Sequence, residues 1–502
     1  MQLFAPIIKD AYKIGHKDQY AKGTEVVYSN ITARSGTHSN IKGSTGVVWV
    51  GLQFVLKDLL IDTWNNTFFN VPKKVVVPLY QAYVSHALGY TVSVDHIAAL
   101  HDLAYLPVEI RALPEGSFVP YKVPMLTIKN TLPEFYWITN MLETMLSAET
   151  WGMITSATTY NAYRLKFTEY AKLTGADPEG IKFQGHDFSM RGMSSSASAA
   201  TSAFAALAAG SVGTDTLPAL QIAQEYYGAD LTKDLVGVSV NATEHSVMCS
   251  NSKEGEIETF RRLMTEVYPE GILSVVSDTW DFWKVVAEFL PQLKDQILAR
   301  DGKLVIRPDS GDPVDIICGT TGPFNNENPA NPTNEQKGLI DCLWSTFGGT
   351  INSKGYKVLD EHIGAIYGDS ITLERQDEIL KRLKSKGYCS SNIVLGIGSY
   401  TYQMVTRDTH GMAIKATYVE IDGEGVEIFK DPKTDNGVKK SAKGLLQVVA
   451  FDDGRLLKLI DQVTRSEAST GALELVFKDG ELLKEVTLEG IREQVRKTCN
   501  HV

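Results

Sequence analysis

The chain has 502 residues, of which 43% are hydrophobic and 22% are charged. This composition is typical of a globular protein with a sizeable core, and it excludes a disordered or fibrous chain. The formal net charge of -11 argues against a broad surface for nucleic acid or for an anionic membrane, since either would need a basic field. We expect neither of these partners.

The N-terminal sequence and the cysteines indicate a cytoplasmic protein. The first ten residues, MQLFAPIIKD, lack the basic region and the long apolar run of a signal peptide. The longest uncharged stretch, residues 192–214, contains eight Ser or Thr residues and is too polar to span a bilayer. The five cysteines form no Cys-x-x-Cys pair, which favours reduced thiols over disulfides or a zinc site.

The first part of the chain, residues 1–145, mixes short predicted strands and helices without a regular alternation. Near the other end, residues 411–430 and 445–490 have alternating apolar and polar residues, with turn sequences at 452–454 and 478–480. We expect residues 1–145 and 401–502 to be the two parts of one composite β-rich α+β domain.

The middle of the chain, residues 146–400, repeats one pattern. Short apolar runs at 236–240, 272–276, 304–306, 363–366 and 393–395 alternate with helical segments such as 256–267, 283–299 and 373–384. Such runs are typical of strands buried on both faces of a parallel sheet. The sequence therefore predicts a doubly wound sheet or a barrel, and an Asn- and Pro-rich surface loop at 319–338.

Each of these apolar runs ends in residues that can carry chemistry. In (β/α) barrels the active site lies at the carboxyl ends of the strands, so five such ends predict one shared site. The segments concerned are Thr243-Glu-His245, Ser277-Asp278, Arg307-Pro-Asp-Ser-Gly311, Gly368-Asp-Ser370 and Gly396-Ile-Gly-Ser399.

His245 and Asp278 follow neighbouring strands of this pattern. A lone histidine is more often structural, but Asp278 is placed to hold the second ring nitrogen of His245. An imidazole oriented in this way is a competent nucleophile or general base.

Asp309 is a candidate site residue for a different reason. An aspartate after a strand commonly caps the next helix, but here Asp312, which precedes Pro313, is the better capping candidate. Asp309 is thus left for the site, where carboxylates can stabilise a cationic transition state or hold Mg²⁺ together with phosphate oxygens.

Two further features suit an anionic substrate. The glycine turns at 368–370 and 396–399 can present backbone N–H groups to a phosphate, and no Walker or Rossmann pattern is present. A basic loop supplies cations in an acidic chain, although most such loops are only solvated. Its lysines are Lys430, Lys433, Lys439, Lys440 and Lys443.

Read together, these segments resemble the nicotinamide phosphoribosyltransferases, which are type II phosphoribosyltransferases. The resemblance spans nearly the whole chain, and the joint order of its motifs is specific. The motifs are Asp10-Ala-Tyr-Lys13, His16, His186-Asp-Phe188, Arg191-Gly192, Gly213-Thr-Asp-Thr216, Glu244-His-Ser246, Val275-Val-Ser-Asp278, Ile306-Arg-Pro-Asp-Ser-Gly311, Gly368-Asp369, Thr406-Arg-Asp408 and Phe429-Lys-Asp-Pro432.

The resemblance implies a fold, a reaction and an assembly. The fold is α/β, with an incomplete (β/α) barrel and a composite β-rich α+β domain, in a homodimer with active sites at the interface. The reaction joins nicotinamide to 5-phosphoribosyl 1-pyrophosphate and releases nicotinamide mononucleotide and pyrophosphate. The resemblance also implies that the reaction needs Mg²⁺, held mainly by substrate phosphates, and that ATP stimulates it by phosphorylating a histidine.

The resemblance also implies a role for each site residue. His245 is the phosphorylated histidine and Asp278 its orienting carboxylate. The ring stacks between Phe188 and Tyr12 of the partner subunit, and Asp215 accepts a hydrogen bond from the carboxamide. Other residues line the ring and ribose region: Arg191, Arg307, Asp309, Ser239 and Ser274. The ribose and 5′-phosphate are held by Gly368, Asp369, Gly398 and Ser399, and the remaining phosphates by Arg34, Arg407, Lys415 and Lys430.

Three other functions stay open. A nicotinate phosphoribosyltransferase of the same fold is the nearest, and Asp215 argues against it because its carboxylate would repel that of nicotinate. A non-catalytic binding protein has no need of His245 with an orienting Asp278. A glycoside hydrolase needs one pair of carboxylates and gives no reason for the many Arg and Lys residues.

Overall fold

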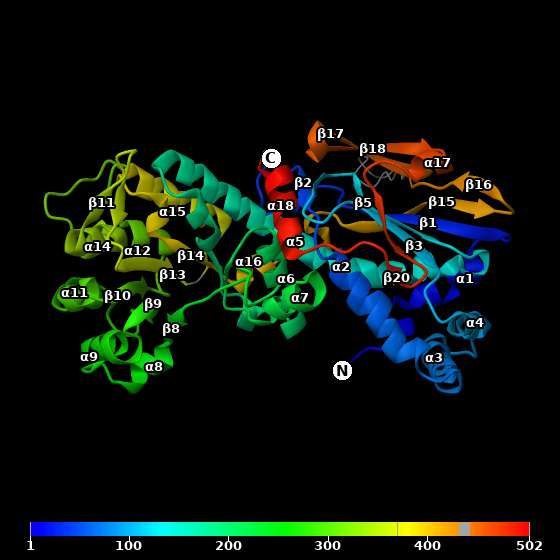
Figure 1. The fold of residues 1–502 in the computed structure, drawn as a ribbon, viewed down its shortest axis with the longest axis horizontal. Helices are drawn as coiled ribbons and strands as arrows, with labels where there is room; N and C mark the ends of the chain where they lie inside the picture. The colour runs from blue at the N-terminus through cyan, green and yellow to red at the C-terminus, as the bar shows by residue number, and fades with distance from the viewer. Residues whose placement is uncertain (1, 369, 431–441, 501–502) are drawn as a thin grey trace.

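Two seven-stranded sheets, joined by a central group of helices, give the molecule two lobes (Figure 1). The computed structural model describes residues 2–368, 370–430 and 442–500. In the lobe on the left of Figure 1 the sheet is parallel, and in the lobe on the right it is antiparallel.

The parallel sheet has the strand order β7-β6-β14-β13-β10-β9-β8. At its β7 edge, Val238 donates from N to the Val212 carbonyl at 2.7 Å and accepts from Thr214 N at 3.0 Å. Because the chain then runs into β8 at the opposite edge, the sheet curls into an incomplete barrel, which confirms the expected fold. Its strands are β6 (Gly185–Asp187), β7 (Gly213–Thr214), β8 (Asn241–Ala242), β9 (Glu270–Val276), β10 (Asp301–Arg307), β13 (Ile363–Tyr367) and β14 (Val394–Ile397).

The expectation of a buried strand at 236–240 is wrong. In this run only Val238 makes a bridge, and Val238 and Val240 are each 39% exposed. The segment lies between the two edge strands, β7 and β8, and its single bridge gives too few backbone hydrogen bonds to form a strand. Of the other four apolar runs, those at 272–276, 304–306 and 363–366 lie within β9, β10 and β13, and the run at 393–395 overlaps β14 from its second residue.

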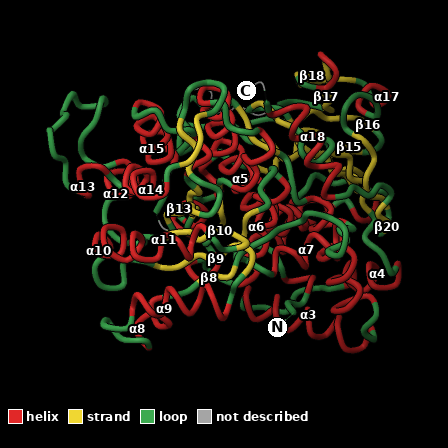
Figure 2. The backbone as a smooth tube through the Cα atoms, turned by 60° about the vertical axis from the view of Figure 1, so that its left-hand side comes forward, coloured by secondary structure: helices red, strands yellow, loops and turns green. Residues whose placement is uncertain are grey.

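Helices alternate with the barrel strands and surround them (Figure 2). The expected helical segments 256–267, 283–299 and 373–384 are helical, with π-type hydrogen bonding at 263–267 and 285–289. The helices are α6 (Ser196–Ala208), α7 (Pro218–Tyr227), α8 (His245–Ser250), α9 (Glu256–Arg262), α10 (Phe282–Lys284), α11 (Leu290–Leu298), α12 (Pro313–Cys318), α13 (Asn334–Lys337), α14 (Leu339–Phe347), α15 (Leu373–Ser385) and α16 (Ser399–Gln403).

The antiparallel sheet takes strands from both ends of the chain, in the order β16-β15-β1-β5-β3-β19-β20. Asn30 of β1 lies opposite Lys415 of β15, so residues nearly 400 positions apart are neighbours. This arrangement is the composite domain that the sequence predicts. The strands are β1 (Thr24–Thr32), β3 (Val108–Ala112), β5 (Pro124–Asn130), β15 (Ala413–Ile421), β16 (Glu424–Glu427), β19 (Glu474–Lys478) and β20 (Glu481–Leu482).

Smaller elements complete this lobe. A hairpin of β17 (Leu445–Phe451) and β18 (Leu456–Val463) lies beside the sheet, with α3 (Lys73–Leu88) and α4 (Asp95–Leu103) below it in Figure 1. The remaining short elements are α1 (His16–Gln19), α2 (Leu52–Val55), α17 (Arg465–Ala468) and the pair β2 (Gly46–Val48) and β4 (Phe118–Pro120).

Two helices tie the lobes together. The long helix α5 (Trp137–Thr174) runs through the domain boundary expected at residue 145, and it contacts α6 and α15 on one side and β1 on the other. Helix α18 (Leu488–Cys499) contacts α6, and its buried Arg492 donates four hydrogen bonds to carbonyls at the base of the barrel. At the other end of the helix, Thr498 accepts from Phe118 N at 3.0 Å, so α18 joins the barrel to the other lobe.

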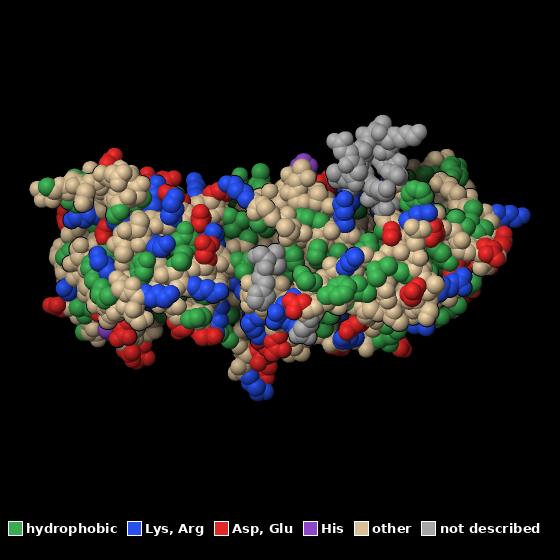
Figure 3. Space-filling view, turned by 90° about the horizontal axis from the view of Figure 1, so that it is seen from above, with side chains coloured by type: hydrophobic (Ala, Val, Ile, Leu, Met, Phe, Trp, Pro, Cys, Tyr) green, Lys and Arg blue, Asp and Glu red, His purple; other side chains and the backbone are tan. Residues whose placement is uncertain are grey.

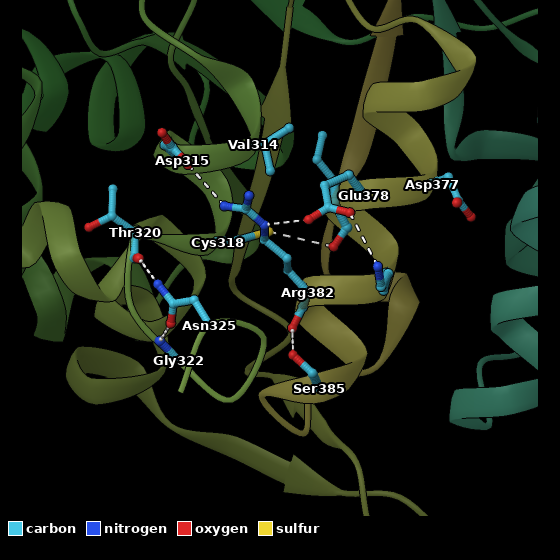
Figure 4. Close-up of polar contacts among 12 residues, drawn as sticks. Val314, Asp315, Cys318, Thr320, Gly322, Asn325, Asp377, Glu378, Arg382 and Ser385 are labelled. Atoms are coloured by element: carbon cyan, nitrogen blue, oxygen red, sulfur yellow. Dashed lines mark hydrogen bonds and ion pairs between the residues drawn. The ribbon is translucent and has the colours of Figure 1, made fainter. Parts of the chain in front are cut away.

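The loop expected at 319–338 projects from the edge of the barrel lobe and contains α13 (Figure 2). Near its start, Asn325 donates to the Thr320 carbonyl at 2.7 Å and accepts from Gly322 N at 3.1 Å. Beside it, Arg382 of α15 bridges Asp315 and Glu378 (Figure 4). The Arg382 guanidinium lies 4.6 Å from the Phe324 ring centroid. These contacts anchor the loop to α12 and α15.

The surface mixes charges of both signs. On the face in Figure 3, basic and acidic side chains are interspersed. Within the described ranges, no helix combines the length and the apolar character needed to cross a membrane.

Candidate active site

A cavity of about 1070 Å³ opens where the parallel strands end. Its lining comes from the residues that follow β6, β7, β8, β10, β13 and β14, together with the start of α6. Four of the five predicted strand ends contribute residues to this cavity, whereas Ser277 and Asp278 do not line it. Eight of the residues expected in the site line it: Phe188, Arg191, Asp215, Arg307, Asp309, Gly368, Gly398 and Ser399.

Asp215 forms the polar end of a group that follows β6 and β7. Its Oδ1 accepts hydrogen bonds from His186 Nε2 at 2.9 Å and from Ser239 Oγ at 2.5 Å. The His186 ring lies against that of Phe188, with 4.4 Å between centroids. An aromatic face and a carboxylate thus meet on one wall of the cavity.

The neighbouring Asp187 holds the two strand ends in place. Its Oδ2 accepts from the hydroxyls of Thr214 and Thr216, and its carbonyl accepts from Asp215 N at 3.0 Å. All three side chains are buried, so this network fixes the position of Asp215 relative to β6.

The surroundings of Asp215 keep it ionised. Burial acts to raise its pKa, but the hydrogen bonds from His186 and Ser239, together with the charge of Arg307, outweigh that effect. The pKa of Asp215 therefore lies below its usual value. The carboxylate is available as a hydrogen-bond acceptor at neutral pH.

His245 begins α8 at the rim of the cavity, and its side chain is half exposed. Its Nδ1 lies 3.1 Å from Thr279 Oγ1, and its Nε2 lies 3.9 Å from Asp278 Oδ1. The contact with Asp278 is an ion-pair distance and not yet a hydrogen bond. The partner actually bonded to the ring is Thr279, which the sequence analysis missed.

Asp278 is buried and organises the turn after β10. Its Oδ2 accepts from Asp309 N at 3.0 Å and from Ser310 Oγ at 2.5 Å. Its Oδ1, which faces His245, accepts no hydrogen bond from any residue in the described ranges. Asp278 therefore links the histidine at the rim to the aspartate in the cavity.

Arg307 and Asp309 form the opposite wall. Arg307 Nη2 donates to the Thr243 carbonyl at 2.5 Å, and Arg307 Nε lies 3.6 Å from Asp309 Oδ2. A Cβ on Gly368 would lie 2.2 Å from Asp309 Oδ1, so only glycine lets the end of β13 approach this carboxylate. Asp312 caps α12 through Val314 N and Asp315 N, which confirms the predicted helix cap.

Some expected site residues do not line the cavity. Ser274 is buried within β9, and Ser239 acts through its bond to Asp215. Asp369 lies outside the described residues, as do Lys433, Lys439 and Lys440 of the basic loop. Lys443 of that loop pairs with Glu427 at 3.0 Å.

A second group of expected residues gathers on the other lobe. Arg34 Nε donates to the Gly411 carbonyl at 2.7 Å, beside the short helix that carries Arg407. Burial lowers the pKa of Lys415; Glu143 opposes this, and Arg34, Lys430 and Lys13 reinforce it. Tyr12 is 66% exposed, and none of the five expected residues of this lobe lines the cavity. These five are Tyr12, Arg34, Arg407, Lys415 and Lys430.

Comparison with known proteins places the chain in a family. A model described as the nicotinate phosphoribosyltransferase (NAPRTase) family matches residues 183–481. A protein of Acinetobacter baylyi named nicotinamide phosphoribosyltransferase is 50% identical over 97% of this chain and 96% of its own length. The chain belongs to this family.

Other family members extend the match. A nicotinamide phosphoribosyltransferase of Mycoplasma pneumoniae is 37% identical over 90% of this chain and 96% of its own length. Among solved structures, a nicotinate-nucleotide pyrophosphorylase from Pyrococcus furiosus has a TM-score of 0.58 at 16% identity, covering 98% of this chain and 95% of the other. Human nicotinic acid phosphoribosyltransferase has a TM-score of 0.53 at 15% identity, covering 97% and 93%. The two structures share the fold of this chain.

Proposed function

We propose that this family member is a nicotinamide phosphoribosyltransferase, which catalyses a step of NAD salvage. It would transfer the 5-phosphoribosyl group from 5-phosphoribosyl 1-pyrophosphate to nicotinamide, giving nicotinamide mononucleotide and pyrophosphate. The family description names nicotinate, whereas the full-length relatives are named for nicotinamide. The observation that favours nicotinamide over nicotinate is the ionised carboxylate of Asp215 in the cavity wall.

Asp215 and Phe188 together form a site for an uncharged pyridine amide. The flat ring packs against Phe188, and a carboxamide N–H donates to Asp215. Nicotinate would place a second carboxylate against Asp215, a like-charge contact that costs several kcal/mol in a desolvated pocket. The geometry therefore supports nicotinamide as the base.

The chemistry exchanges one bond at the ribose for another. The bond from C1′ to the pyrophosphate oxygen breaks while the pyridine nitrogen bonds to C1′, through a transition state with positive charge on the ribosyl group. Asp309, in the cavity wall, is placed to stabilise that charge. The glycine turn at Gly398 and Ser399 offers N–H groups to the 5′-phosphate.

Mg²⁺ and ATP are part of the proposal. Hard oxygen donors suit Mg²⁺, and Asp309 can supply one of its ligands while phosphate oxygens and water supply the rest. When bound, the ion would neutralise charge that develops on the departing pyrophosphate. The exposed imidazole of His245 would accept the γ-phosphoryl group of ATP and release ADP, with Asp278 and Thr279 holding the ring.

The working enzyme is proposed to be a cytoplasmic homodimer with shared active sites. Five expected site residues lie on the lobe without the cavity, and Tyr12 is exposed there. A second copy could bring these residues to the cavity that their own chain leaves incomplete. All five cysteines are unpaired, which supports a reducing compartment.

Product formation tests the proposal. Purified protein is incubated with 5-phosphoribosyl 1-pyrophosphate and Mg²⁺, with nicotinamide or nicotinate, each with and without ATP. We expect mononucleotide from nicotinamide, at a higher rate with ATP. Preference for nicotinate would retain the reaction type and refute the role of Asp215, and no product from either base would favour the binding-protein alternative.

A further inference from the structure

His186 has no role in the proposed reaction, yet its side chain connects β6 directly to the carboxylate of Asp215. His186 is the middle residue of β6, and its largely buried side chain donates from Nε2 to Asp215 Oδ1. A carboxylate only accepts hydrogen bonds, so the Nε2 nitrogen must carry the proton in this contact.

Both hydrogen bonds to Asp215 fall on the same oxygen. His186 and Ser239 each bond to Oδ1, and Oδ2 accepts none from the residues that the structure describes. Asp215 lines the cavity, so the carboxylate is fixed through one oxygen while the other remains for a ligand. Without the two donors the carboxylate could rotate about its χ2 torsion, which is broad and roughly two-fold.

The local backbone holds the imidazole in this position. His186 is paired with Gly213 of the adjacent strand, and a Cβ on Gly213 would lie 2.8 Å from His186 Nδ1. A glycine is needed there for the ring to lie over β7 and reach Asp215. On its other side the ring packs against Phe188, the aromatic wall of the base site.

We propose that His186 is a positioning residue for base selection: by holding Asp215 Oδ1, it presents Oδ2 to the carboxamide N–H of nicotinamide. The inference rests on the proposed function and deepens it. His186 does not touch the reacting atoms; it acts through Asp215. Loss of the hydrogen bond should therefore affect the choice and binding of the base more than the handling of 5-phosphoribosyl 1-pyrophosphate.

Two substitutions separate the hydrogen bond from the packing. His186→Phe keeps an aromatic ring beside Phe188 but removes the donor, whereas His186→Gln places an amide N–H close to the position of Nε2. His362→Phe is the matched control, because His362 makes a similar 2.7 Å bond to Asp360 just before β13, among residues that do not line the cavity. Gly213→Ala is a further variant, in which the donor stays but the ring must move.

The readouts are the KM for each substrate and the ratio of kcat/KM for nicotinamide to that for nicotinate. For His186→Phe we expect the KM for nicotinamide to rise and the ratio to fall, each roughly tenfold, as the loss of one hydrogen bond to a charged group implies. The KM for 5-phosphoribosyl 1-pyrophosphate should stay within about twofold. His186→Gln should recover most of the loss, Gly213→Ala should shift the ratio in the same direction as His186→Phe, and His362→Phe should match the wild type.

The outcomes distinguish this inference from the proposed function. If the wild type uses nicotinamide but His186→Phe leaves the ratio of kcat/KM values unchanged, the inference is overturned and the proposed function stands. Equal impairment of His186→Phe and His186→Gln would also overturn it, because packing and not the hydrogen bond would then be responsible. Wild-type protein that uses neither base would overturn both. If His186→Phe fails to fold, Gly213→Ala decides, and an unchanged ratio in that variant counts against the inference.

Discussion

At the scale of single residues, His410 shows how burial alone sets a proton equilibrium. Its side chain is fully buried, and its Nδ1 lies 2.9 Å from the hydroxyl oxygen of Tyr121. Its carbonyl accepts from Arg34 N at 3.0 Å, so the residue also fixes the strand end that carries a phosphate-binding candidate. Burial lowers the pKa of His410 to about 4.

This shift predicts a pH dependence of stability. Above pH ~6.5 neither the folded nor the unfolded chain protonates this residue, and the stability is complete. As the pH falls from about 6.5 to about 4, only the unfolded chain binds the proton, so the folded state loses about 2 kcal/mol by pH 5. Denaturant unfolding at pH 7 and pH 5 measures how much the free energy of unfolding falls between the two values. This fall should be smaller in His410→Phe than in wild type by the same amount. Equal losses would contradict the assignment.

Residue-level features were predictable from the sequence where the signal is local. The cap at Asp312 could be read from the adjacent Pro313, and the reactive residues at strand ends could be read from the strand pattern. Pairings between distant positions could not. His186 and Asp215 are 29 positions apart, and His245 and Thr279 are 34 apart, so only the register of the strands brings them together.

At the scale of elements, α18 depends on one buried side chain. Arg492 donates to the carbonyls of Leu207, Ser211, Leu235 and Val236 at 2.7–3.1 Å, and only 8% of the residue is exposed. Leu207 and Ser211 lie at the end of α6 and just before β7, and Leu235 and Val236 precede the single bridge at Val238. A helix from the far end of the chain donates to all four carbonyls. No pattern in the sequence of residues 488–499 indicates this contact, because its acceptors are backbone atoms.

Arg492→Met should lower the free energy of unfolding by about 3 kcal/mol, because it leaves several buried carbonyls without donors. Arg496→Met on the same helix is the control: Arg496 is 54% exposed and pairs with Glu489, so we expect a change below about 0.5 kcal/mol. Denaturant unfolding of both variants measures the difference. Similar small changes in the two would show that the Arg492 hydrogen bonds are not what holds α18 to the barrel.

The barrel strands illustrate what hydrophobic runs can and cannot predict. Runs at 272–276 and 304–306 are strands because each has a strand neighbour on both sides. The run at 236–240 is also rich in β-branched residues, but it lies at the seam of the sheet and makes a single bridge. The composition of a run indicates whether it tends to be buried. Whether it forms a strand depends on which strands lie beside it in the curled sheet.

At the scale of the whole molecule, the candidate site is divided between two lobes. Several of the expected base and ribose residues line the barrel cavity, whereas Tyr12 and the remaining phosphate-binding candidates lie in the other lobe. The sequence predicted both sets through the family resemblance. The resemblance also implied that residues of the two sets come from different subunits, but the sequence alone does not give the positions of the lobes, because these depend on how α5 and α18 connect them.

Mixed dimers test the shared site. Asp309→Asn damages the barrel half and Arg407→Ala the sheet half, so each homodimer should be nearly inactive. Co-expression of the two should recover about a quarter of wild-type activity, since half of randomly paired dimers are mixed and each has one intact site. Activity no greater than the sum of the separate variants would place each site within a single chain.

The most direct test of the whole account is a competition between the two bases in wild type and in Asp215→Ser. Wild type and Asp215→Ser are each given equal concentrations of nicotinamide and nicotinate with limiting 5-phosphoribosyl 1-pyrophosphate, and the ratio of the two mononucleotides is measured. We predict a strong excess of nicotinamide mononucleotide in wild type. In Asp215→Ser the ratio should fall at least roughly tenfold, because the carboxylate that accepts from the amide and repels nicotinate is gone. An unchanged product ratio in the variant would contradict the account.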